Sequence, residues 1–234
     1  MRLILKFKPL TSHSYDSVGA YDVQGFIYNL LRGTYFHKHH LHRGFKFFTF
    51  SNIFPITPYS LDHEKTLIIS SPNVNLAWHI YEQLKNRSIF NLNKYPMQIV
   101  SVRKSFQKPR RNIITATPIV LYEDNTNNRY FSFKKDEFRF FFKRLENNAL
   151  KKYNAYYQED LVLQEPLVTD FKFKKEVPVN IKLHGETILI IGSMWKLKWN
   201  ISDDMRKLTH FLFDTGLGEK NSLGMGFINN YQRK

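Results

Sequence analysis

Residues 216–227 read GLGEKNSLGMGF and hold four of the ten glycines in this 234-residue chain, at positions 216, 218, 224 and 226. Glycine adopts positive φ angles without strain and lets backbone N–H groups approach a ligand closely, as in loops that bind phosphate groups. The segment lies between a predicted helix and the last predicted strand. It therefore predicts either a loop that contacts a phosphate-bearing ligand or a helix C-cap at Gly216 followed by a tight turn into an edge strand.

Two common nucleotide-binding loops do not fit this segment. A P-loop ends in Gly-Lys-Ser or Gly-Lys-Thr, whereas Gly224 is followed by Met225. A dinucleotide-binding fold places its GxGxxG motif after a strand and before a helix, whereas this segment follows a helix and precedes a strand. Nucleotide binding of these two types is therefore disfavoured.

Hydrophobic periodicity predicts the same order of elements in both halves of the chain. In the second half we expect a strand at 113–122, a helix with an apolar stripe over 138–149, strands at 167–183 and 187–199, a helix after Ser202, and a strand at 225–229. In the first half we expect a strand at 1–8, a helix with an apolar stripe over 23–31, strands at 45–51 and 65–70, a helix that begins after Asn73, and a strand at 97–102. Strand, helix, strand, strand, helix, strand is the ferredoxin-like plan. The sequence thus predicts an α+β protein with two tandem ferredoxin-like (RRM-like) domains, at residues 1–108 and 109–234.

The charge of the chain indicates a polyanionic partner. It has 35 Lys and Arg against 20 Asp and Glu, a formal net charge of +15 at pH 7, which favours nucleic acid over a basic surface that serves solubility alone. The absence of cysteine excludes disulfides, a thiol nucleophile and thiolate zinc sites. No apolar run approaches the roughly 20 residues of a membrane-spanning helix, so we expect a cytoplasmic protein without a membrane partner.

The glycine-rich segment, placed between a helix and the C-terminal strand, resembles the signature loop of the RAMP superfamily. In this form it is similar to the CRISPR repeat-cleaving endoribonucleases, which process precursor guide RNA. The segments RLILKF, QGFIYNLL and GFKFFTFS resemble the opening elements of that family in order and spacing. The match in individual residues covers about 24–51 and 214–227, and elsewhere only the architecture is similar.

This resemblance implies the chemistry to expect. The ribose 2′-OH would attack the adjacent phosphate without a metal or another cofactor, leaving a 2′,3′-cyclic phosphate and a 5′-OH end. The implied partner is CRISPR repeat RNA, with other subunits of a CRISPR effector complex as further partners, and the protein would be a monomer or a homodimer. The alternative is a repeat-RNA-binding subunit without catalytic activity.

Residues 37–42 hold four of the nine histidines, at positions 37, 39, 40 and 42. They could bind a metal, lie solvated in a loop, or serve as acid or base on RNA, because imidazole titrates near neutral pH. No HExxH pairing or neighbouring carboxylate completes a recognisable metal site, so we expect none. The family resemblance implies His40 as the catalytic histidine, with Tyr28 and Lys46, and His42 is the alternative if the register shifts by two residues.

The apolar stripe of the predicted helix at 23–31 independently supports Tyr28 as a catalytic residue. At 100° per residue, Tyr28 lies about 130° from the centre of that stripe, so we expect its side chain to face solvent or a partner.

Three groups of residues are predicted to contact RNA. In strands with one buried face, lysines alternate with large apolar residues such as Trp195, Leu197 and Trp199, which we expect to face the core. The predicted RNA-binding residues are Gly216, Gly218, Lys220, Asn221, Ser222, Gly224 and Gly226 in the loop, Arg110 and Arg111 in the connector, and Lys172, Lys174, Lys196 and Lys198 in the strands.

Overall fold

The computed structural model describes residues 1–41, 44–61, 63–124, 129–133, 137–183 and 186–232. The first half contains β1 (Arg2–Pro9), a 3₁₀ turn η1 (Tyr15–Ser17), α1 (Ala20–Leu30), α2 (Tyr35–Leu41), β2 (Thr49–Phe50), β3 (Lys65–Ser70), α3 (Val74–Lys85), β4 (Ile89–Leu92) and β5 (Tyr95–Ser105). The second half contains β6 (Asn112–Thr115), β7 (Tyr122–Asp124), β8 (Arg129–Tyr130), α4 (Phe138–Tyr157), β9 (Val168–Leu183), β10 (Glu186–Trp199), α5 (Asp203–Thr215), a 3₁₀ turn η2 (Asn221–Leu223) and β11 (Ile228–Asn230).

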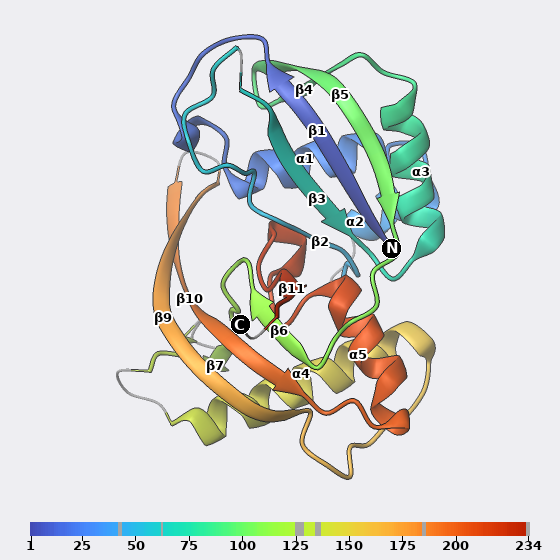
Figure 1. Cartoon of the computed structure of the whole chain (residues 1–234), viewed down its shortest axis with the longest axis vertical. Helices are drawn as coiled ribbons and strands as arrows, with labels where there is room; N and C mark the ends of the chain where they lie inside the picture. The colour runs from blue at the N-terminus through green and yellow to red at the C-terminus, as the bar shows by residue number, and fades with distance from the viewer. Residues whose placement is uncertain (42–43, 62, 125–128, 134–136, 184–185, 233–234) are drawn as a thin grey trace.

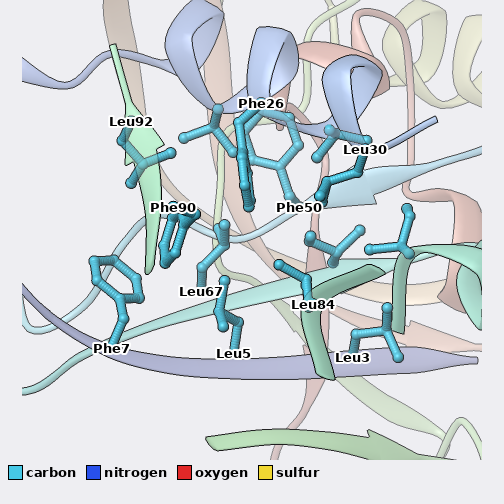
Figure 2. Close-up of a cluster of buried hydrophobic side chains, with 14 of the residues drawn as sticks. Leu3, Leu5, Phe7, Phe26, Leu30, Phe50, Leu67, Leu84, Phe90 and Leu92 are labelled. Atoms are coloured by element: carbon cyan, nitrogen blue, oxygen red, sulfur yellow. The ribbon is translucent and has the colours of Figure 1, made fainter. Parts of the chain in front are cut away.

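The first sheet has the strand order β2-β3-β1-β5-β4, and β1 pairs antiparallel with both of its neighbours. Alternate residues of β1 enter the core, while α1 and α3 cover that face of the sheet. Figure 2 shows Leu3, Leu5 and Phe7 of β1 pointing toward Phe26 and Leu30 of α1. Asn73 caps α3, because its side chain accepts a hydrogen bond from the backbone N–H of Leu76 at 3.0 Å.

The second sheet has the order β11-β6-β10-β9, and α4 and α5 pack against one of its faces. Trp195, Leu197 and Trp199 are buried in this core, as the alternation in the sequence predicts. In both sheets the first strand lies between the third and the last, and the second strand pairs with the third. The predicted α+β class with two tandem ferredoxin-like units is confirmed. The sheets lie on either side of residues 106–111, and the boundary at 108/109 stays a prediction.

Several strands are shorter than predicted. The helix α2 and the strand β4 were not predicted from the sequence. The strand predicted at 45–51 is wrong for most of its length, because Gly44 and Phe47 adopt positive φ angles of 132° and 52° that interrupt extended backbone. The strand predicted at 113–122 ends at Thr115 and continues as isolated bridges, since Pro118 cannot donate to a ladder. The last strand begins at Ile228, after the positive φ of Gly226.

Arg2 joins the two halves, and Figure 1 shows the N-terminus near their junction. Its guanidinium donates to the carbonyl oxygens of Phe213 and Ile228 at 2.9 and 2.7 Å and to Asn229 Oδ1 at 2.7 Å. It also lies over the rings of Phe213 and Phe227, at 3.8 and 4.6 Å from their centroids. Burial lowers the pKa of Arg2 to about 10, which leaves it charged at neutral pH. The first strand therefore fixes the residues on both sides of the glycine-rich loop.

Within the described residues, none of the helices combines the length and the apolar content that crossing a membrane requires.

Candidate functional site

The glycine-rich loop begins where α5 ends. Gly216 is the C-cap of α5, and its N–H donates to the carbonyl oxygen of Leu212 at 2.9 Å. The chain then turns into β11, which is an edge strand. The C-cap interpretation of Gly216 is thereby confirmed as a description of the local structure.

All four glycines of the loop are buried and have positive φ angles between 69° and 85°. A Cβ at Gly226 would lie 1.8 Å from the Leu217 carbonyl oxygen, and one at Gly218 would lie 2.5 Å from the Val120 carbonyl oxygen. At Gly224 a Cβ would meet the ring of Phe50 at 2.4 Å. The glycines therefore allow the loop to pack closely against the protein. Residues 219–223 between them are partly exposed and form the accessible part of the loop.

Two polar side chains hold the loop from within. Lys152 of α4 is 2% exposed, and its Nζ donates to the carbonyl oxygens of Gly216 and Gly218 at 2.7 and 3.0 Å and to Asn221 Oδ1 at 2.9 Å. Asn221 in turn donates from Nδ2 to the carbonyl oxygens of Leu217 and Met225, at 3.0 and 2.9 Å.

Lys152 is a residue that the sequence analysis missed. It follows Leu145 and Ala149 on the buried face of α4, three residues after Ala149, so it continues the apolar stripe with a charged side chain. The sequence did contain a signal for this residue, a lysine on the apolar stripe of a predicted helix. Lysine is almost never fully buried without partners, so a lysine at such a position indicates a specific set of contacts.

The outer side of the loop packs against α1. Gln24 Nε2 donates to the carbonyl oxygen of Ser222 at 2.9 Å and to its hydroxyl at 3.1 Å. The Ser222 side chain also lies beside Tyr28, close enough to lower the pKa of its phenol. The accessible part of the loop and the first helix are thus in direct contact, across almost 200 residues of sequence.

Tyr28 is 7% exposed, so the expectation that it faces solvent is wrong. The side of α1 opposite its main apolar stripe is covered by the protein's own loop and by Phe48, whose ring lies edge-on to Tyr28 at 5.6 Å. Burial raises the pKa of Tyr28 to about 12, and the neighbouring Ser222 side chain acts in the opposite direction. The phenol is therefore neutral at physiological pH and acts there as a hydrogen-bond donor or acceptor.

Lys46 lies between two adjoining hollows. The larger, of about 400 Å³, is lined by Lys46, by α4 and by the accessible part of the loop, including Lys220 and Ser222. The smaller, of about 260 Å³, is lined by Lys46, Tyr28 and Phe36, among others. Burial lowers the pKa of the Lys46 ammonium. The structure thus gathers two of the three predicted catalytic residues and the predicted loop residues in one region.

The histidines can be placed only in part. His40 lies in α2, one helical turn after Phe36, but its side chain is outside the described part of the structure. His42 lies entirely outside the described residues. In the part of the chain that is described, no three His, Cys, Asp or Glu side chains are arranged to hold a metal ion. The choice of His40 over His42 stays a prediction.

A second basic surface lies on the face of the second sheet opposite α4 and α5. Lys172, Lys196 and Lys198 line a hollow of about 370 Å³ with Tyr231, whose ring centroid lies 4.8 Å from Lys196 Nζ. Lys174 is exposed nearby on β9, and Arg110 and Arg111 are exposed in the connector. Among the described residues, none lines both this hollow and the two beside Lys46.

Comparison with known proteins gives consistent matches. The family model described as "CRISPR associated protein Cas6, C-terminal" matches residues 101–230. The chain is 40% identical over 243 residues to "CRISPR-associated endoribonuclease Cas6 2" of Methanocaldococcus jannaschii, covering 98% of this chain and 99% of that protein. It is 21% identical over 252 residues to "CRISPR-associated endoribonuclease Cas6" of Haloferax mediterranei, covering 98% and 93%.

Two solved structures are similar over nearly the whole chain. One, described as "CRISPR associated protein Cas6", has a TM-score of 0.72 and 22% identity and covers 99% of both chains. The other, described as "An RAMP protein binding different RNA substrates", has a TM-score of 0.72 and 20% identity and covers 99% of this chain and all of that one. At these identities the likeness concerns the fold.

Proposed function

Because the chain belongs to the Cas6 family, we propose that it is an endoribonuclease that cleaves CRISPR repeat RNA to release guide RNAs. One observation carries this proposal. The glycine-rich loop packs against α1 so that Tyr28, Lys46 and Ser222 surround adjoining hollows, next to the helix that contains His40. Acid–base groups and a cation around an open hollow are what cleavage of a phosphodiester by its own ribose requires.

We propose that the reaction proceeds without a metal. The 2′-oxygen forms a bond to the adjacent phosphorus, the bond from phosphorus to the 5′-oxygen breaks, and the products carry a 2′,3′-cyclic phosphate and a 5′-OH. One group takes the proton of the 2′-OH and another gives a proton to the departing 5′-oxygen. His40 is assigned one of these roles, because an imidazole exchanges protons near neutral pH.

Tyr28 and Lys46 are assigned supporting roles in the same step. The raised pKa of Tyr28 keeps its phenol protonated, so it orients the reacting group or exchanges the other proton in its neutral form. Lys46 would stabilise the negative charge that grows on the phosphorane. That interaction is stronger in a partly buried site than in water, and it favours the transition state over the bound substrate.

Cleavage of labelled repeat RNA in the presence of EDTA tests this function. We expect full activity with the chelator, and a 2′-deoxy substitution at one nucleotide should block the cut while leaving binding intact, because that position lacks the attacking hydroxyl. Loss of activity in EDTA would contradict the metal-free mechanism and restore the metal interpretation of the histidines. Binding of unmodified RNA without any cleavage would instead identify the chain as a non-catalytic repeat-RNA-binding subunit.

The second basic surface is proposed to bind the RNA backbone. We expect Lys196→Ala to weaken binding of repeat RNA and unrelated RNA alike, and to reduce the slope of log K against log salt by about 0.7 to 0.9, the value for one lost phosphate contact. Lys143→Ala, which removes an exposed charge from α4, is the matched control and should leave the slope unchanged. Filter binding from about 50 to about 300 mM salt, roughly a sixfold range, measures both slopes. Equal slopes for the two variants would remove this surface from the RNA path.

A further inference from the structure

We propose that Lys152 is a positioning residue of the cleavage site, because its ammonium group holds the glycine-rich loop in the conformation that places Ser222 beside Tyr28. The expected effect of Lys152 on cleavage rests on the proposed function. Its structural part, the effect of Lys152 on the loop, can be tested without any RNA.

The contacts of Lys152 match the donors of an ammonium group. An ammonium has three N–H donors, and the three acceptors within 3.0 Å of Nζ are the carbonyl oxygens of Gly216 and Gly218 and Asn221 Oδ1. The Gly216 carbonyl also belongs to the C-terminal end of α5, where the helix dipole favours a cation. One buried side chain of α4 therefore binds the start, the first turn and the accessible part of the loop.

These contacts continue from Lys152 to the proposed site. Asn221 accepts from Lys152 and donates to the backbone on both sides of the accessible segment, at Leu217 and Met225. The next residue, Ser222, is held by Gln24 and contacts Tyr28. If Lys152 loses its ammonium group, its three acceptors lose that donor, two of them at buried hydrogen bonds, and the segment beside Tyr28 loses its support from the interior.

The position of Lys152 is not explained by packing alone. Leu145, Ala149 and Tyr153 around it on α4 are buried, and an apolar side chain of similar length would fill the same space without desolvating a charge. Burial lowers the pKa of Lys152, and Glu219 opposes that shift. What the lysine adds over an apolar residue is the set of three directed hydrogen bonds to the loop.

The first test replaces the ammonium group with a thioether of similar size. In Lys152→Met we expect faster amide hydrogen exchange in the peptide that spans 213–227, and a single-turnover cleavage rate about 100-fold lower at saturating RNA, as for a small misplacement of reacting groups. The salt dependence of RNA binding should stay unchanged, because a buried lysine contacts no phosphate. Lys143→Met on the exposed side of α4 is the control, and it should match the wild type in all three measurements.

The second test restores the ammonium chemically. The chain has no cysteine, so Lys152→Cys can be alkylated at one position in denaturant and then refolded. Bromoethylamine yields an aminoethyl cysteine that is close to lysine in length and charge, whereas bromoethane yields a shorter side chain without nitrogen. We expect the aminoethyl form to recover wild-type exchange and cleavage, and the ethyl form to behave as Lys152→Met. Wild-type protein taken through the same steps controls for refolding.

The outcomes separate the inference from the function on which it rests. Wild-type exchange and cleavage in Lys152→Met, or equal recovery with both alkylating reagents, would overturn the inference. A salt slope reduced by about 0.7 to 0.9 would also overturn it, by making Lys152 a phosphate contact. If Lys152→Met does not fold, Asn221→Ala tests the same connection from the loop side and should show the same faster exchange. A wild-type protein that cleaves no RNA would contradict the proposed function, and the exchange data alone would then decide the role of Lys152 in the loop.

Discussion

Replacing His40 with alanine is expected to reduce the single-turnover rate of repeat-RNA cleavage by about 10³-fold, within the range for loss of a general acid or base. The dissociation constant, measured with a 2′-deoxy RNA that cannot react, should stay within about twofold, since a single imidazole contributes little of the affinity for the RNA backbone. The part of the pH dependence of the rate that an acid or base imidazole supplies should disappear with it. Rapid quench of 5′-labelled RNA between pH 5 and 9 measures both effects.

The control for this prediction is His42→Ala, two residues further along the same histidine-rich segment. It should cleave at the wild-type rate and keep the full pH profile. The opposite result, with His42→Ala inactive and His40→Ala active, would show that the register inferred from Lys46 is shifted by two residues. Wild-type rates for both variants would remove this segment from the chemistry and leave Tyr28 and Lys46 without the proposed proton-transfer partner.

Replacing Gly226 with alanine is expected to lower the free energy of unfolding by about 3 to 5 kcal/mol, as large steric and backbone conflicts do. The residue has a φ of 69°, a region that costs an alanine about 1 to 2 kcal/mol. The new Cβ would lie 1.8 Å from the Leu217 carbonyl oxygen. To relieve this clash, Leu217 and residue 226 would have to move apart, which would break the hydrogen bond of 2.9 Å from the Leu217 N–H to the carbonyl oxygen of residue 226. Because both ends of the loop would move, cleavage should be lost as well. Urea denaturation followed by tryptophan fluorescence measures the change.

Gly25→Ala is the matched control for this effect. Gly25 is exposed in α1, and a Cβ there would meet no described atom within 4 Å. Alanine at an exposed helix position should raise the free energy of unfolding by about 0.5 to 1 kcal/mol. If Gly226→Ala were as stable as Gly25→Ala, the close packing of the loop against Leu217 would be wrong.

The elements that the sequence predicted best are those with strong local patterns. The third strand was predicted as Lys65–Ser70 with the observed bounds, and the Asn73 cap and the C-cap at Gly216 were also found, because each depends on neighbours within a few residues. The weaker predictions failed where the backbone departs from regular geometry. Phe47 with its positive φ is one such position, and nothing in a run of aromatic residues signals it.

For the site, sequence patterns identified residue types and the structure decided their roles. The glycine cluster indicated a special loop, and the family resemblance singled out Tyr28 and Lys46, which the fold does bring together. The exposure of the Tyr28 side chain could not be predicted. Helical periodicity gives the direction of a side chain relative to its own helix, but it does not reveal that a loop from the other end of the chain covers Tyr28.

The sequence alone determines the local structure of this protein: the alternation of apolar residues in the strands, the apolar stripes of the helices and the glycines that permit positive φ. It also determines the net charge of +15, which indicates a polyanionic partner. The contacts that build the site join residues far apart in the chain, such as Arg2 with Ile228, Gln24 with Ser222, and Lys152 with Gly216. Such pairs form only when two sheets and their helices have packed, because hydrogen bonds act over about 3 Å, whereas sequence patterns describe only near neighbours. For that reason the contacts of the buried Lys152 with the loop became visible only in the tertiary structure.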